Sequence, residues 1–185
     1  MDPATLRRIS ECGKALAIAC ARAMTIGESV NLPTMVAGCA RMSGSYLLRS
    51  FRLDLSTVPP GQAVLSVEAS NKTPQLLRLC ASTLQTLGTT IPSTPPASLE
   101  EQGSKLKQDF LDAQRTLEPV FAPLKLQHSL DDEQMAKAAA VATGALIHQF
   151  AKYMDPSAGF GYAAYGFTEG ARTAPLRMSP SPNTT

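Results

Sequence analysis

An amphipathic helix is encoded by residues 2–27, which read DPATLRRISECGKALAIACARAMTIG. Asp2 is a good N-cap, Pro3 suits the first helical position, and Gly27 supplies a stop. Apolar residues recur at three- and four-residue steps, and interleaved alanines widen the face that they form. We therefore predict a first helix whose middle is covered by neighbours on several sides.

The same signals predict four more helices downstream, because each expected start combines a capping residue with a proline or with acidic residues in the first turn. Their expected ranges are 31–51, 73–88, 98–119 and 129–155. Gly44 and its small neighbours weaken the propensity of the second helix, which indicates either close contact with another helix or a break near Ser43. The sequence leaves residues 63–69 open between a short strand and a helical turn.

The fold class that follows is all-α, a bundle of about five helices with an irregular C-terminal segment. The chain divides into an N-terminal helical half, a Pro/Ser/Thr linker, a C-terminal helical hairpin, and a Gly/aromatic strap with a disordered tail. These segments span residues 1–88, 89–97, 98–155 and 156–185. We expect one compact domain, with two helical hairpins joined by the Pro-rich linker as the alternative arrangement.

One internal echo accompanies this division. Residues 35–47 and 135–147 align without gaps at an offset of 100, sharing an alanine and a glycine at matching positions. Each segment lies in the second helix of an expected helix pair. Either a duplicated hairpin or the matching composition of two alanine-rich helices explains the echo.

Composition narrows the function classes. The net charge is +2, from 17 basic and 15 acidic residues, so no strong field points to nucleic acid or to a membrane surface. No apolar stretch approaches the roughly 20 residues of a membrane span. The four cysteines form no CxxC pair, which favours small buried hydrophobic side chains in a reducing cytoplasm over disulfides or a metal site. No cofactor is expected.

Groups that could carry catalysis are sparse. His128 precedes the acidic first turn of the last helix, and His148 lies beside the core line of that helix. Asp131 or Asp132 could orient His128, but the pattern identifies no nucleophile for either histidine, so both are weak candidates for a polar site. The sequence therefore argues against an enzyme.

Two features suggest a binding surface. Three arginines share one face of the second helix, namely Arg41, Arg49 and Arg52. Four aromatic residues fall in the glycine-rich segment, namely Phe160, Tyr162, Tyr165 and Phe167. We expect a non-enzymatic helical module for protein interaction or assembly, with the partner either a second copy or another protein. The alternatives are a small-molecule or lipid binder with the Gly/aromatic segment as its lid, and a nucleic-acid-associated protein using the arginine faces.

Overall fold

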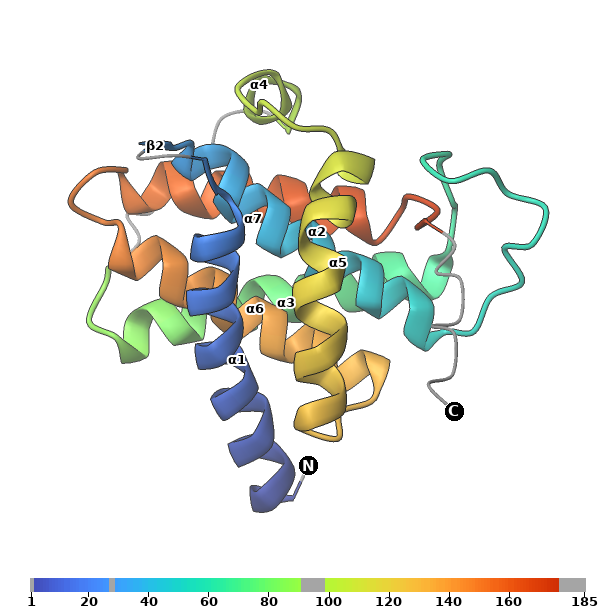
Figure 1. The fold of residues 1–185 in the computed structure, drawn as a ribbon, viewed down its shortest axis with the longest axis horizontal. Helices are drawn as coiled ribbons and strands as arrows, with labels where there is room; N and C mark the ends of the chain where they lie inside the picture. Colours follow the sequence, from blue (N-terminus) through green and yellow to red (C-terminus); the bar gives the residue numbers. More distant parts are fainter. Residues whose placement is uncertain (1, 27–28, 91–98, 177–185) are drawn as a thin grey trace.

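The computed structural model describes residues 2–26, 29–90 and 99–176. In this part of the chain seven helices form, and a short antiparallel hairpin joins the first two (Figure 1). The elements are α1 (Pro3–Ala23), β1 (Thr25–Ile26), β2 (Ser29–Val30), α2 (Leu32–Ser50), α3 (Val67–Thr86), α4 (Leu99–Ser104), α5 (Phe110–Gln127), α6 (Asp132–Gln149) and α7 (Pro156–Gly170). The predicted all-α class is confirmed, with two helices more than the five expected.

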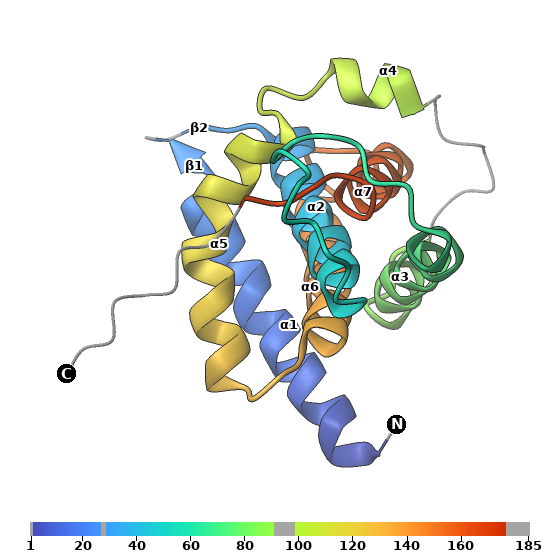
Figure 2. The ribbon, with the colours of Figure 1, turned by 90° about the vertical axis from the view of Figure 1, so that its right-hand side faces the viewer.

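Six of the helices form three layers. Helices α1 and α5 lie side by side in one layer, α2 and α6 form the middle, and α3 and α7 form the third (Figures 1 and 2). The middle helix α6 packs against α1 and α3, whereas the middle helix α2 packs against α5 and α7. Each half of the chain thus covers the central helix of the other half. The alternative of two helical hairpins is wrong, because helices adjacent in the sequence contact each other far less.

The correspondence between the two halves of the chain extends to single positions on α2 and α6. Asn31 and Asp131 are the N-caps of α2 and α6, at the offset of 100 seen in the sequence. The Sγ of Cys39 lies 3.7 Å from the carbonyl oxygen of Ala139, again 100 residues away. The echo between residues 35–47 and 135–147 therefore falls on the two central helices, which face each other where the two halves meet.

Helix α2 is the most enclosed element, with each residue from Thr34 to Leu48 buried. Asn31 caps it by accepting a 2.9 Å hydrogen bond from the backbone N–H of Thr34. The break considered near Ser43 does not occur, and the Ser43 hydroxyl donates a 2.6 Å hydrogen bond to the Ala136 carbonyl of α6. Small residues let this helix accept neighbours on every side.

The closest of those neighbours is α7. An ideal Cβ built on Gly44 would lie 2.5 Å from the Phe167 carbonyl oxygen, and one built on Gly166 would lie 2.5 Å from that of Ala37. Gly170 faces the Arg41 backbone in the same way. The two backbones are in direct contact, which requires glycine at these positions.

The Gly/aromatic segment was expected to be an irregular strap, and that prediction is wrong. Asp155 caps α7 by accepting a 3.0 Å hydrogen bond from the Ala158 N–H, and Pro156 occupies the first turn. Glycine in a helix interior costs about 1 kcal/mol relative to alanine. Here the helix-to-helix contact that glycine permits outweighs its poor propensity.

Several expected helix bounds also differ. Helix α3 begins at Val67 after the N-cap Ser66, so Pro74 lies inside it and residues 67–69 are helical. Just before it, Ala63 forms an isolated β-bridge with Thr173. The structure therefore resolves residues 63–69 as a bridge followed by a helix start.

The later helices show similar differences. Helix α5 continues through Pro119 and Pro123, because the buried side chains around them hold the last turns against the core. The expected helix 98–119 is divided into α4 and α5, with Asp109 as a new N-cap. Helix α6 is capped by Asp131 in place of Ser129. The Ser98 cap, most of the linker and the tail from residue 177 lie outside the described residues.

None of the helices in the described ranges is both long and apolar enough to cross a bilayer.

The contact between α2 and α7 gives a first prediction. Gly44→Ala forces a methyl group into the α7 backbone and should lower the free energy of unfolding by about 1–3 kcal/mol or more. Gly38→Ala on the same helix is the matched control, because its methyl group meets the mobile end of Met24 at 3.3 Å. The control should be neutral or gain up to about 1 kcal/mol from helix propensity.

Urea unfolding followed by circular dichroism measures both variants. Equal destabilisation of Gly44→Ala and Gly38→Ala would contradict the close approach of α2 and α7.

Candidate functional site

The aromatic residues proposed as a partner surface lie mainly inside the protein. Phe167 is fully buried and Tyr162 nearly so, in the interior that α7 helps to form. Phe160 and Tyr165 are half-buried, and the Tyr165 hydroxyl donates a 3.1 Å hydrogen bond to Glu169. The structure does not bring these four side chains together as an exposed docking surface.

The arginines are not a shared basic face either. Arg41 is 2% exposed, and its guanidinium bonds to Glu169 and donates a 2.7 Å hydrogen bond to the Gln108 carbonyl. Arg49 pairs with Glu118, and Arg52 is exposed just beyond α2 with a positive φ of 52°. Sequence periodicity placed Arg41 on an outer face because it does not reveal that α7 and the residues after α4 cover that face.

The two histidines belong to different elements. His128 ends α5 as its C-cap and is half-buried. His148 is exposed near the end of α6, where its Nδ1 lies 2.7 Å from the Thr89 hydroxyl. Neither histidine lines a described cavity.

The four cysteines are free and buried. Burial raises the pKa of the Cys12 thiol to about 11 and that of Cys80 further above its ordinary value. Thiols in this state are poor nucleophiles at neutral pH. Within the described residues no group of histidine, cysteine and acidic side chains is arranged to hold a metal ion.

A buried charge cluster joins α2 to α5. Glu118 accepts hydrogen bonds of 2.8 and 2.6 Å from the Arg49 guanidinium and one of 2.8 Å from the Tyr46 hydroxyl. Burial raises the pKa of Glu118, but the bonds and charge of Arg49 outweigh it, so the pKa lies below its ordinary value. Burial and the neighbouring Glu118 charge raise the pKa of Tyr46. Arg49 is thus paired and Tyr46 neutral, as in a structural cluster.

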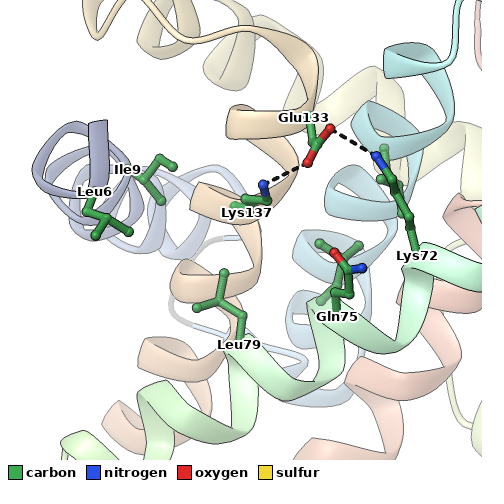
Figure 3. Close-up of a pocket in the computed structure, with 9 residues that line it drawn as sticks. Leu6, Ile9, Lys72, Gln75, Leu79, Glu133 and Lys137 are labelled. Atoms are coloured by element: carbon green, nitrogen blue, oxygen red, sulfur yellow. Dashed lines mark hydrogen bonds and ion pairs between the residues drawn. The ribbon is translucent and has the colours of Figure 1, made fainter. Parts of the chain in front are cut away.

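A predominantly apolar cleft with charged residues on its rim lies between α1 and α3, over the start of α6. We call it the α1–α3 cleft; its volume is about 230 Å³ (Figure 3). Its lining residues are Leu6, Ile9, Leu47, Lys72, Gln75, Leu76, Leu79, Glu133 and Lys137. Leu6 is 53% exposed, although Ile9, Leu47 and Leu76 beside it are buried. A large apolar side chain on an open cleft marks a place where a further apolar group can be buried.

Three charged residues form one edge of this cleft. Glu133 of α6 accepts a 2.7 Å bond from the Lys137 ammonium and a 3.1 Å bond from that of Lys72 on α3 (Figure 3). The bond from Lys137 lowers the pKa of Glu133 despite partial burial, and Lys72 adds to this effect. Two ammonium groups share one carboxylate, so the edge carries one surplus positive charge.

Helix α3 packs less extensively against α6 than α7 packs against α2. Leu79 and Lys137, which line the cleft, take the positions that Gly166 and Ala37 take in the other half. Two small residues let α7 meet α2, whereas the matching positions of α3 and α6 carry two long side chains that line the cleft. Sequence reasoning missed this site, since each side chain looks like an ordinary boundary residue, and no local signal reports the spacing of two helices.

Glu133 also lines a second cleft, which is polar. Its other lining residues are Ser50, Arg52, Lys125, Asp131 and Asp132. Lys125 is bonded to Asp132, and the Asp131 carboxylate is used as the α6 cap. Most of its charged groups are therefore already bonded within the protein, so the apolar cleft is the stronger candidate.

The Glu118 cluster gives a second prediction. Glu118→Gln leaves Arg49 without its counter-charge and should lower the free energy of unfolding at neutral pH by about 2–4 kcal/mol. Because the folded-state pKa of Glu118 is lowered, its contribution is present above the unfolded-state pKa and is lost as pH falls through the folded-state value. The difference in free energy of unfolding between the native protein and the variant should therefore become smaller as the pH is lowered toward about pH 3.

Denaturant unfolding at neutral pH and at about pH 3 measures this difference in stability. Asp112→Asn is the control, because it breaks an exposed pair with Arg115 on the same helix and should cost less than about 1 kcal/mol. A gap for Glu118→Gln that does not change with pH would contradict the ion pair.

In comparisons with known proteins, no family model, curated protein or solved structure matches this chain.

Proposed function

We propose that the protein is a helical recognition module that binds an apolar segment of a partner protein in the α1–α3 cleft. The observation that carries this proposal is the combination of an almost entirely apolar lining with a half-exposed Leu6 at its edge. Burial of apolar surface contributes roughly 25 cal/mol per Å², so an apolar partner group gains free energy by entering.

The size of the cleft favours a protein partner over a free small molecule. Pockets that enclose drug-sized ligands have volumes of roughly 300–1,000 Å³, and this cleft is smaller, at about 230 Å³. It suits one or two apolar side chains that project from a larger surface. Helix-in-groove recognition works in this way, with anchor side chains entering a cleft between helices.

The charged edge supports the same function. Lys72 and Lys137 remain partly exposed beside Glu133, so a partner that presents a carboxylate there meets the surplus positive charge. The apolar lining supplies affinity, and the charged edge favours one orientation of the partner.

A second candidate is a small amphipathic ligand with an acidic head group, which the same lining and edge would accept. Nucleic-acid binding has less support, because Arg41 and Arg49 are held in internal ion pairs. A cytoplasmic location and self-association stay predictions.

Site-specific photo-cross-linking tests the proposal in cells that naturally express the chain. A photoreactive residue at position 6 should form an adduct of protein mass, and Leu79→Glu should remove at least about nine-tenths of it by placing a charge in the cleft. The matched position is Tyr153, which is 80% exposed at the far end of α6. It should form no such adduct.

Unfolding curves must show that the Leu79→Glu chain is folded. Adducts that form equally at positions 6 and 153, or that persist in Leu79→Glu, would refute a site in the cleft. An adduct of small-molecule mass at position 6 would favour the amphipathic ligand.

A further inference from the structure

The α1–α3 cleft has a counterpart on the opposite edge of the middle layer. Gly44 meets Phe167 and Gly170 of α7, and Gly144 meets Cys80 and Thr83 of α3. Cys80 of α3 thus corresponds to Phe167 of α7, and Thr83 corresponds to Gly170. Both pairs are 87 residues apart, so other positions on α3 can be matched to α7 by the same offset. The counterpart of the cleft therefore lies between α5 and α7, over the start of α2.

That counterpart is covered by the chain itself. Helix α4 packs against α7 and crosses above it, since each helix is seen end-on in the view where the other lies in the plane (Figures 1 and 2). An ideal Cβ on Gly103 would lie 2.9 Å from the Tyr165 ring, and Gln102 is 3% exposed. The residues that follow are tied down, since the Lys107 N–H donates a 3.0 Å hydrogen bond to the Thr34 hydroxyl.

The two central helices also differ in burial at matching positions. Ala37 of α2 is fully buried, whereas its counterpart Lys137 of α6 keeps a side chain that is 24% exposed. Helix α4 has no equivalent over α6 among the described residues. The two edges of the middle layer thus have matching helix arrangements, and the edge beside α6 lacks a covering helix among the described residues.

The chemistry of the uncovered edge differs from that of the covered one. Tyr165 of α7 lies against Gly103 of α4, and the matching α3 position holds Arg78, which is exposed. With Lys72 and Lys137, Arg78 makes this edge basic, and Glu133 is the acidic residue among the cleft lining. An acidic segment complements it.

We infer that the partner element is a short acidic helix with an apolar anchor, which lies on α3 as α4 lies on α7. This inference rests on the function proposed for the cleft and adds the shape and charge of the occupant. The anchor enters between Leu6 and Leu79, and acidic side chains face Lys72, Lys137 and Arg78. Such a helix closes the edge that the chain leaves open.

The symmetry of the fold supplies a direct test that needs no identified partner. Asp109 caps α5 and Asp2 caps α1, so a copy of residues 98–109 can replace residues 1–2 after an initiating Met, with its final Asp serving as the α1 cap. The grafted helix then precedes α1 as α4 precedes α5. Tethering gives an effective concentration of about 1 mM or more, enough to detect weak docking.

Hydrogen exchange of the α3 amides over residues 72–79 is the measurement. The graft should slow their exchange by about threefold or more, because docking suppresses local opening of α3. The matched control carries Lys at both glutamates of the grafted copy, and should leave exchange within about 1.5-fold of the parent chain. Circular dichroism must show equal helix content in all three chains.

The graft should also remove the cross-link at position 6, since it occupies the cleft. Equal exchange with the acidic and the lysine grafts, or no protection by either, overturns the acidic helix. If the position 6 cross-link and its sensitivity to Leu79→Glu persist in the parent chain, the recognition function survives that failure. If the cross-link is absent as well, both proposals fail.

Discussion

Direct backbone contact between α2 and α7 is the constraint on which the other packing depends. Gly44, Gly166 and Gly170 remove the side chains that would otherwise separate the two helices. Interiors are close-packed, so an extra methyl group at such a contact has no free volume to enter. With α7 held this close, α2 becomes the enclosed centre of the molecule, and Arg41 must find its partners inside the protein. Its bonds to Glu169 and Gln108 follow from that enclosure.

The other half uses the same frame with a different spacing. Gly144 brings α3 close to α6 at one point, and farther along Leu79 and Lys137 line the cleft. An apolar cleft thus arises from two side chains that are large where their counterparts are small. A binding site can emerge in this way without a special motif, because the repeated frame determines where an uncovered edge must lie.

Local signals in the sequence predicted the features that are locally determined. The cap and proline at residues 2–3 and at residues 31–33 mark helix starts because the side chain and backbone involved are near neighbours. Pro119 and the glycines of α7 misled the prediction, since tertiary packing overrides weak propensity there. The candidate site was out of reach for a related reason. Leu6 lies among the periodic apolar residues of the first expected helix, yet it is 53% exposed because it borders the α1–α3 cleft, which no local signal predicts.

The packing of each half of the chain around the central helix of the other half also affects folding during synthesis. Helices α1 and α3 bury their apolar faces against α6, which is synthesised last of the three. Until α6 leaves the ribosome, both faces remain in water, and α2 waits in the same way for α5 and α7. Formation of this core therefore requires that α5, α6 and α7 have been synthesised. Exposed apolar surface of this kind makes partly folded chains prone to aggregation.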